Sequence, residues 1–242
     1  MIDRTAPSNR PEGKSDGTQR WESLLFCHWE IDPEELLPHV PSGLDLDTFE
    51  GRAYVGIVPF KLREIRPSWL PKQLAFNFLE TNVRTYVTYN GRPGVYFFSL
   101  DANSRLAVLA ARIGWSLPYY HATMTASEVG QSISYASHRR GGRANHRVSF
   151  RIGDKVGHPP DGSVEHFLVE RYLLFVEKKG AIHCGQVHHS PYEVWNAEIS
   201  EIEEELVAAS GLEKTGHLPC LVHYSPGVDV EVFEIRAVPE VN

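Results

Sequence analysis

Cysteine is scarce in this chain, and long apolar runs are missing. The three cysteines, at positions 27, 184 and 220 of 242, lie far apart and give neither a disulfide framework nor a zinc-ribbon pattern. No apolar run approaches the ~20 residues that a helix needs to cross a bilayer. The N-terminus lacks the apolar segment of a secretory signal. We therefore expect a soluble, cytoplasmic protein without a membrane partner.

An excess of basic charge and two common functional motifs are also absent. The 24 Lys and Arg residues are outnumbered by 31 Asp and Glu residues, for a formal net charge of −7, whereas a general nucleic-acid binder carries a basic face. The sequence contains no Gly-x-Ser-x-Gly elbow for a serine nucleophile and no glycine-rich dinucleotide fingerprint. Neither a nucleic-acid partner nor a cofactor is expected.

The chain is instead rich in residues that suit a β-sheet core. Hydrophobic residues make up 42% of it and aromatic residues 11%, and aromatic side chains pack well on pleated sheets. Residues 1–19 are polar with almost nothing to bury, so we expect a flexible tail. Order is expected to begin near Trp21. Since no linker interrupts the remainder, residues 20–242 are predicted to form a single domain.

The clearest local signal is a hairpin centred on residues 90–94, which read Asn-Gly-Arg-Pro-Gly. Residues 76–89 and 95–100 flank it and have the composition of antiparallel strands. If Tyr89 pairs with Gly94, the cross-strand pairs that follow are Asn82 with Asp101 and Arg84 with Ser99.

Other elements are predicted from capping residues and apolar spacing. Asp32 followed by Pro33 predicts the start of a short helix. Ile199, Ile202 and Leu206 recur at helical spacing, which predicts an amphipathic helix over residues 200–210. A further helix is predicted over residues 104–113, strands over 53–62, 131–137, 147–152, 181–187 and 228–238, and either state over 164–175.

Charged residues occur inside apolar strands. Because side chains alternate across a strand, Glu80, Asn82 and Arg84 project to one face. Asp101 follows an apolar run, and Arg112 sits among apolar residues. Ionised groups in apolar surroundings are costly unless they are paired or hydrogen-bonded. They predict either a buried ion network that fixes strand register or a polar pocket that binds a ligand.

In the pocket interpretation each charge has a role. Arg84 or Arg112 would hold a substrate carboxylate bidentately, and Asp101 belongs to the same binding group. Glu80 would act as the general acid or base, because burial and neighbouring arginines shift a carboxyl pKa.

Two other polar groups have simpler explanations. The histidines at 183, 188, 189 and 223 and the cysteines at 184 and 220 match no zinc spacing, so no metal site is predicted. His189 is either a core or rim histidine or a substrate-binding residue with a role in proton transfer. The arginines at 139, 140, 143 and 147 surround Gly141-Gly142 and are expected to form a solvated hairpin tip.

Several phrases together resemble the YqjF-like uncharacterised bacterial family of the acetoacetate-decarboxylase-like superfamily. They are the segments at 44–51 (LDLDTFEG), 58–60 (VPF), 80–87 (ETNVRTYV), 94–102 (GVYFFSLDA) and 117–120 (LPYY). The resemblance runs from about Trp21 to near the C-terminus. It implies an α+β, mainly β fold: a closed, cone-like antiparallel β-barrel with flanking helices and a central cavity. Relatives in the superfamily form oligomers, so a homo-oligomer is implied by resemblance only.

The same resemblance bears on chemistry. Decarboxylases of the superfamily use a Schiff-base lysine within a segment that matches residues 111–120 here, where Arg112 and Pro118 are retained but Tyr119 and Tyr120 replace both lysines. A tyrosine cannot form an imine. The tyrosines would line the cavity and donate hydrogen bonds to a developing oxyanion, or pack at the edge of the core. The resemblance also adds Arg171 to the buried charges. Lys61 is the one lysine within a clearly apolar strand.

These observations leave three readings of function. The leading one is a protein that binds a small carboxylate or carbonyl compound, as a cofactor-independent enzyme without a Schiff-base lysine. Its catalytic residues would be Glu80, Tyr119 and Tyr120. The alternatives are a non-catalytic ligand-binding or sensor protein, and a structural or assembly protein whose interior is filled.

Overall fold

The computed structural model describes residues 2–105, 108, 117–142, 144–213, 216 and 218–238. Within this part the chain is mainly β, as the composition predicts, and its strands join into one 13-stranded sheet. The strands are β1 (Gly17–Ile31), β2 (Asp45–Leu46), β3 (Ala53–Pro67), β4 (Phe76–Tyr89), β5 (Arg92–Ala102), β6 (Tyr119–Val129), β7 (Ser132–Arg139), β8 (Asn145–Gly157), β9 (Leu173–Lys178), β10 (Ala181–His188), β11 (Val194–Glu204), β12 (Leu221–Val232) and β13 (Arg236–Ala237).

Helices in the described part are short. They are the α-helices α1 (Pro33–Leu36), α3 (Val164–Val169) and α4 (Leu206–Ala209) and the 3-10 helices η1 (Ala6–Ser8), η2 (Leu37–His39) and η3 (Lys72–Leu74). The predicted cap of α1 is confirmed, since the Asp32 side chain accepts a hydrogen bond from the Glu34 amide at 2.8 Å. None of these helices has the length and apolar character that a membrane span requires. The helix predicted over residues 104–113 lies mostly outside the described residues.

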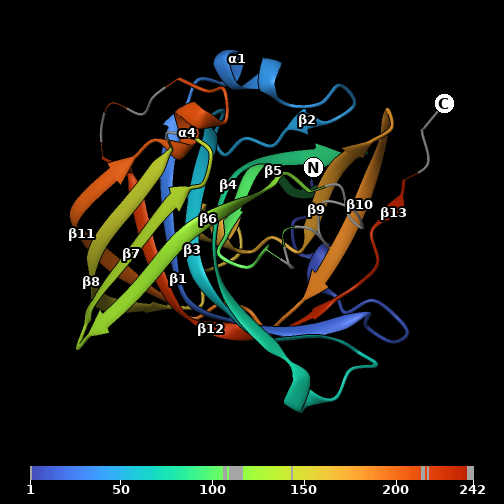
Figure 1. Ribbon diagram of the computed structural model, residues 1–242. Coiled ribbons are helices and arrows are strands. Elements are labelled where there is room, and N and C mark those ends of the chain that lie inside the picture. Colours follow the sequence, from blue (N-terminus) through green and yellow to red (C-terminus); the bar gives the residue numbers. More distant parts are fainter. Residues whose placement is uncertain are drawn as a thin grey trace.

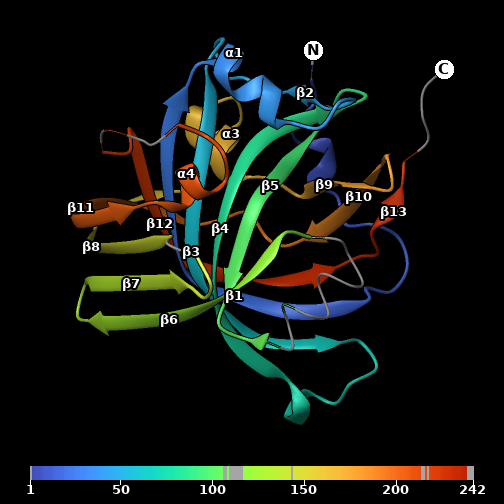
Figure 2. The ribbon, with the colours of Figure 1, turned by 45° about the horizontal axis from the view of Figure 1, so that its top comes forward.

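The strands follow the order β13-β10-β9-β5-β6-β7-β8-β11-β12-β1-β3-β4-β2, and two further pairings join β5 to β4 and β10 to β12. In Figure 1, β7, β8 and β11 lie on the left and β9, β10 and β13 on the right, with the long strands β1, β3 and β4 between them and β6 crossing in front. Figure 2, with the top of the molecule turned forward, shows α1 above this central group. The long strands β1, β3 and β4 are therefore flanked by shorter strands on both sides.

Alternate residues of the central strands face two separate apolar clusters. The first core contains Phe26 of β1 and Tyr86 of β4, and Phe167 and Leu168 of α3 pack into it. The second core contains Val83 of β4, with most of its other members from β1, β3, β7, β8 and α4. Because side chains alternate along a strand, the middle of β4 presents successive residues to the two cores in turn, whereas Val87 and Tyr89 near its end belong to a third cluster with Leu173 and Phe175. This division places the polar residues described below.

The β4–β5 hairpin differs in register from the prediction. Its turn is Asn90-Gly91, both with positive φ (51° and 73°), as a two-residue hairpin turn requires. Tyr89 therefore pairs with Arg92 rather than Gly94, and a β-bulge in β5 separates the pair Val83 and Ser99 from the pair Arg84 and Phe97. The predicted pairing of Asn82 with Asp101 is wrong.

The helix predicted over residues 200–210 is also wrong for most of its length. Residues 194–204 form β11, which pairs with β8, and α4 covers only residues 206–209. The register is irregular between Ile199 and Glu201. A bulge adds one residue to the two-residue period of a strand, so Ile199 and Ile202 both pack against the second core. Their spacing of three imitates a helix.

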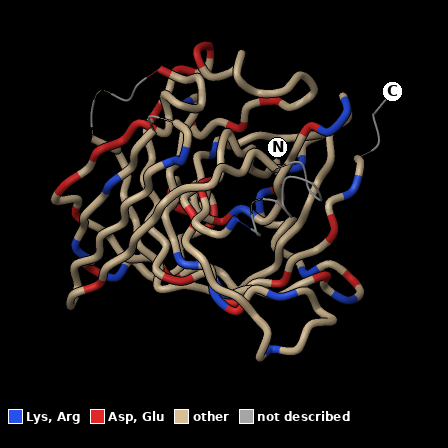
Figure 3. Tube along the Cα trace, viewed as in Figure 1, with Lys and Arg blue, Asp and Glu red and all other residues tan. Residues whose placement is uncertain are grey.

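The segment before β1 contacts the sheet. Gln186 of β10 donates to the carbonyl oxygen of Pro7 at 2.9 Å, and Arg10 forms an ion pair with Glu231 of β12 at 2.6 Å. The guanidinium of Arg4 contacts the carboxylate of Asp47. Figure 3 shows the acidic and basic residues spread along many strands instead of gathered at one side of the view.

Candidate functional site

Glu80 lies on the first-core face of β4 and is bound by its neighbours. The hydroxyl of Tyr119 donates to Glu80 Oε2 at 2.7 Å, and the side chain of Asn82 adds a second hydrogen bond. Burial nevertheless raises the pKa of Glu80 to about 7, because the apolar surroundings penalise the charged form more than the two hydrogen bonds favour it. Glu80 therefore changes its protonation near neutral pH, which is the property of a general acid or base.

Arg84 lies four residues after Glu80 on the same face of β4, and it has no counter-charge among the described residues. Its Nη2 donates to the carbonyl oxygen of Leu168 at 2.9 Å, and its guanidinium lies 5.5 Å from the ring centroid of Phe26. Its Nε has no hydrogen-bond partner. No carboxylate among the described residues forms an ion pair with it, although it is only 9% exposed. A buried guanidinium in this state has donors available for an anion.

Tyr86 and His28 continue this polar group on the first-core side. The Tyr86 hydroxyl donates to the Leu168 carbonyl oxygen at 2.7 Å, so it accepts from Nε2 of His28, also at 2.7 Å. Gly56 provides the space, since a Cβ there would lie 3.1 Å from the His28 ring. Burial holds the pKa of His28 well below its ordinary value, and its Nδ1 has no partner. His28 is therefore neutral.

Arg171 belongs to a second buried ion group beside Tyr86. Its Nη1 forms an ion pair with Asp47 at 2.8 Å, its Nε donates to the carbonyl oxygen of Phe167 at 2.7 Å, and its guanidinium lies 5.0 Å from the Tyr86 ring centroid. Arg4 shares the Asp47 carboxylate. Burial is the largest influence on the pKa of Arg171 and lowers it. Arg171 therefore belongs to a buried ion group. Its partner Asp47 was not identified in the sequence analysis.

Asp101 lies on the other face of the sheet. It alternates with Leu100 and Ala102, which belong to the first core, so its carboxylate points away from Glu80. Its partner is Arg139, with Nη2 at 2.6 Å and Nε at 3.0 Å from Oδ1. Burial raises the pKa of Asp101 even though Arg139 opposes this shift. The expectation that Arg139 sits at a solvated hairpin tip is wrong, because its side chain is only 7% exposed.

The two adjacent tyrosines of β6 are separated in the same way. Tyr119 pairs with Leu100 and belongs to the first core, whereas Tyr120 pairs with Asp101. The ring centroid of Tyr120 lies 3.9 Å from the guanidinium carbon of Arg139. Only Tyr119 joins Glu80. Arg112, the retained arginine of this region, lies outside the described residues.

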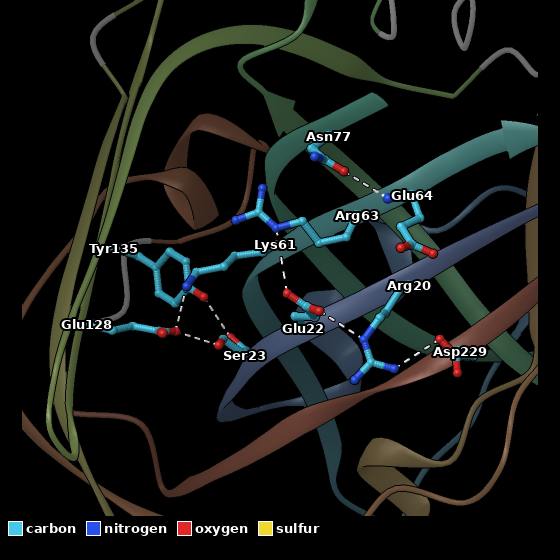
Figure 4. Close-up of polar contacts among 10 residues, drawn as sticks. All are labelled: Arg20, Glu22, Ser23, Lys61, Arg63, Glu64, Asn77, Glu128, Tyr135 and Asp229. Carbon is cyan, nitrogen blue, oxygen red and sulfur yellow. Dashed lines mark hydrogen bonds and ion pairs between the residues drawn. The ribbon is translucent and has the colours of Figure 1, made fainter. Parts of the chain in front are cut away.

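Lys61 faces away from the first core, because it alternates with Phe60 and Leu62, which belong to it. Figure 4 shows its amine directed at Glu128, with Ser23 and Tyr135 beside them. The Nζ lies 2.6 Å from Glu128 Oε1, and Ser23 Oγ donates to the same oxygen at 2.5 Å. The amine is therefore part of an ion pair on the opposite side of the sheet from Glu80 and Arg84.

His183, His188 and His189 have separate partners. His189 is buried between the rings of Tyr172 and Tyr192, at centroid distances of 4.5 and 4.7 Å. His183 and His188 hydrogen-bond to backbone carbonyl oxygens of Ala181 and Ser8. In the part of the chain that the structure describes, no group of three His, Cys, Asp or Glu side chains is arranged to hold a metal ion.

The first-core face of β4 therefore brings Glu80, Asn82 and Arg84 together with Tyr119, while Asp101 and Tyr120 lie on the reverse side. The sequence analysis missed Tyr86 and His28. Tyr86 continues the two-residue alternation of Glu80, Asn82 and Arg84, which could have identified it. His28 has no comparable signal, since its place opposite Gly56 depends on the pairing of β1 with β3.

The chain is similar to curated and solved proteins along nearly its whole length. It is 37% identical over 228 residues to "Uncharacterized protein YqjF" of Bacillus subtilis (strain 168), covering 93% of this chain and 94% of that protein. Among solved structures, the enduracididine biosynthesis enzyme MppR, complexed with pyruvate, matches with a TM-score of 0.66 at 13% identity, covering 95% of this chain and 93% of that one. An acetoacetate decarboxylase from Legionella pneumophila matches with a TM-score of 0.66 at 14% identity, covering 97% and 93%.

These likenesses agree with the sheet described above and identify an acetoacetate-decarboxylase-like fold. The model of one protein family, DUF2071, described as "Uncharacterized conserved protein", matches residues 18–229. The resemblance found in the sequence is confirmed, and the chain belongs to this family of YqjF-like proteins.

Proposed function

We propose that the protein binds a small carboxylate that also carries a carbonyl group, on the first-core face of β4, and that Arg84 holds the carboxylate. The observation that carries this proposal is the state of Arg84: a buried guanidinium with a free Nε and no ion-pair partner among the described residues. Leaving such a donor unsatisfied costs free energy. A ligand carboxylate would supply both the missing acceptor and the missing charge.

Proton transfer in this proposal belongs to Glu80. With a pKa of about 7, it is populated in both protonation states at neutral pH, so it can take a proton from or return one to a bound molecule. Tyr119 orients the carboxyl through its hydrogen bond to Oε2. Tyr120 has no part in this step, because it faces the other way. The reaction would need no cofactor.

Imine chemistry is not part of the proposal. The amine of Lys61 is paired with Glu128 on the opposite face, and residue 119 is a tyrosine that contacts Glu80. The solved neighbours support the class of ligand only by analogy: one is described as complexed with pyruvate and another as an acetoacetate decarboxylase. Both names refer to small oxo acids. We also propose that the circuit of strands leading from β5 back to β4 forms the cone-like barrel of that superfamily.

The test is calorimetric titration of pyruvate and acetoacetate into the wild type and Arg84→Gln. Loss of a charge-assisted hydrogen bond costs about 1.5–3 kcal/mol, so the variant should bind about 10- to 100-fold more weakly. Arg151→Gln is the matched control, since it removes an exposed arginine paired with Glu198 and should leave binding unchanged. Binding that survives Arg84→Gln would remove Arg84 from the site.

The two alternative functions give different results in the same experiment. A sensor or other non-catalytic binder would show saturable binding and no turnover, and Glu80→Gln would change only affinity. A structural protein would bind none of these acids. One observation supports the structural alternative: the Leu168 carbonyl oxygen accepts hydrogen bonds from both Arg84 and Tyr86, which hold each other in place without a ligand.

A further inference from the structure

Arg84 and Glu80 lie inside the protein, where their side chains are only 9% and 4% exposed. A small acid reaches them only if part of the structure moves aside. The strands β1, β3 and β4 and the helix α3 contribute buried side chains to the first core and are held in place by them. A segment that covers this core without contributing to it can move at the lowest cost.

The N-terminal segment, residues 2–10, has this character. No side chain from residue 2 to residue 16 is buried, and the helix η1 within the segment has only three residues, too few to be stable by itself. Residues 12–14 are exposed, and Gly13 among them has a positive φ of 90° with open space around it. Beyond this point the amide of Asp16 donates to the carbonyl oxygen of Val232 at 2.9 Å, which fixes the chain to β12.

Hydrogen bonds at the surface position the segment along β10. Gln186 donates to the carbonyl oxygens of Pro7 and Asn9 at 2.9 and 3.2 Å, and Nδ1 of His188 lies 3.1 Å from the carbonyl oxygen of Ser8. Figures 1 and 2 both show the dark-blue N-terminal segment beside this strand. These groups are at most partly buried, so water can replace the bonds when the segment leaves.

Arg4 connects the same segment to the interior. Its guanidinium forms an ion pair with the buried carboxylate of Asp47 and lies 5.1 Å from the ring centroid of Phe167 in α3. Asp47 also pairs with Arg171, so one carboxylate holds a cation of the core and a cation of the segment. Withdrawing Arg4 would therefore uncover Asp47 and Arg171 without leaving a buried charge unpaired, which keeps the cost of opening low.

Arg171 leads from this ion group to the interior. Its guanidinium lies 5.0 Å from the ring centroid of Tyr86, and Tyr86 and Arg84 donate to the same carbonyl oxygen, that of Leu168. Contacts thus run without a break from Arg4, which is 28% exposed, to Arg84.

We propose that residues 2–10 form a lid over the first core, that the ion pair between Arg4 and Asp47 holds the lid closed, and that a ligand reaches Arg84 only when the lid opens. The third statement rests on the function proposed for Arg84, whereas the first two do not. The lid moves about Gly13, while Asp16 stays on β12.

Closure of the lid also changes the charge around a bound anion. With the lid closed, the guanidinium groups of Arg4, Arg84 and Arg171 lie in one series of contacts with a single ion-paired carboxylate, that of Asp47. An additional cation attracts an anion more strongly. A ligand carboxylate therefore binds the closed form better and favours closure over itself.

Hydrogen exchange followed by NMR tests whether Arg4 holds the lid. The amides of Ser8 and Asn9 are hydrogen-bonded only within η1, which cannot persist once the segment leaves the sheet. In Arg4→Gln they should exchange about 10- to 100-fold faster than in the wild type, the usual effect of losing a charge-assisted hydrogen bond. The amide of Asp16 should be unchanged. Since no side chain of the segment is buried, the variant should keep the fold.

Arg10→Gln is the matched control on the same segment. Arg10 pairs with Glu231 at the surface, at 2.6 Å, and exposed ion pairs contribute little. Exchange of the two lid amides should therefore remain close to that of the wild type. Unchanged exchange in Arg4→Gln, or equal acceleration in Arg10→Gln, would overturn the role given to Arg4.

Methylglyoxal, a dicarbonyl of about the size of pyruvate that modifies guanidinium groups, tests whether the opening leads inward. Arg171 should react about tenfold or more faster in Arg4→Gln than in the wild type, in step with the population of the open lid. Peptide mass spectrometry locates the modification. Arg139, buried with Asp101 on the reverse face, is the control and should react equally slowly in both proteins. Equal rates at Arg171, or acceleration at Arg139 as well, would refute the lid.

Pyruvate separates the lid from the function proposed for the interior. If the lid controls entry, pyruvate should associate and dissociate about tenfold or more faster in Arg4→Gln, as measured by the line width of its methyl ¹H resonance. Unchanged rates in a variant whose lid is released would place the entry elsewhere and contradict the third statement. If pyruvate does not bind the wild type, the function proposed for Arg84 fails, and amide exchange and methylglyoxal still decide whether the lid exists.

Discussion

The protonation of Glu80 makes a specific prediction about stability and pH. Its carboxyl has a native pKa of about 7, against an ordinary value of 4.5. Between these two values the native state binds more protons than the unfolded state, so the free energy of unfolding must fall as the pH rises. The contribution of protonated Glu80 is fully present below pH 4.5 and is lost above pH 7. Glu80→Gln removes this dependence, because an amide stays neutral at every pH.

The size of the effect follows from the shift. The difference of 7 − 4.5 = 2.5 pH units corresponds to about 3 kcal/mol, at about 1.4 kcal/mol per unit. Any misfit of the new amide, including its hydrogen bond with Tyr119, adds a constant offset that does not vary with pH. The quantity to compare is therefore the change in the stability difference between the two proteins, from pH 4.5 to pH 7.5.

Urea denaturation followed by circular dichroism at half-unit steps of pH measures this quantity. Relative to wild type, Glu80→Gln should gain about 3 kcal/mol over the range. Glu201→Gln is the control at an exposed carboxyl and should track the wild type. A stability difference that is flat between pH 4.5 and pH 7.5 would refute the reasoning, since it would mean that Glu80 is ionised in the native state or open to water.

Two other buried groups give predictions of their own. His146 is buried with neither ring nitrogen bonded, and burial lowers its pKa from 6.5 to about 4; stability should therefore fall as the pH drops from 6.5 to 4, and His146→Phe should remove about 3 kcal/mol of that loss in urea titrations. Asp101→Asn should destabilise the fold by about 3–5 kcal/mol, because it leaves Arg139 buried without a counter-charge. Adding Arg139→Met should restore part of this loss, and a double variant no more stable than Asp101→Asn would contradict the pairing.

The sequence predicts that Glu80, Asn82 and Arg84 lie on one face. This prediction requires only that residues 80–84 form a regular strand, because side chains alternate along any strand. It also predicts the hairpin at Asn90-Gly91, where both residues have positive φ. The predicted pairing of Tyr89 with Gly94 differs by two residues from the observed pairing of Tyr89 with Arg92. A register shift of two residues does not change the face on which a side chain lies. With the observed turn and a regular β5, Asp101 would lie opposite Glu80.

The β-bulge at Phe98 changes the result for Asp101. One extra residue in β5 turns every later side chain to the other face, so Asp101 lies opposite Thr81 instead of an inward residue. Nothing in the local sequence specifies a bulge, and the burial of Arg139 depends on it. A bulge at Ile199–Glu201 likewise produced the spacing that suggested a helix. The face on which a side chain lies could be predicted wherever the strand is regular. The predictions for Asp101 and for residues 200–210 are wrong because a bulge adds one residue to β5 and to β11.

The bulge also separates two kinds of buried charge. On the reverse face, Asp101 and Arg139 satisfy each other, so they need no ligand and their role is explained by packing alone. On the first-core face, burial raises the pKa of Glu80 to about 7, and Nε of Arg84 has no hydrogen-bond partner. Without the bulge, Asp101 would lie opposite Glu80 and on the same face, which would place a second carboxylate in the group that contains Arg84. The bulge therefore keeps the carboxylate of Asp101 on the reverse face, where it pairs with Arg139.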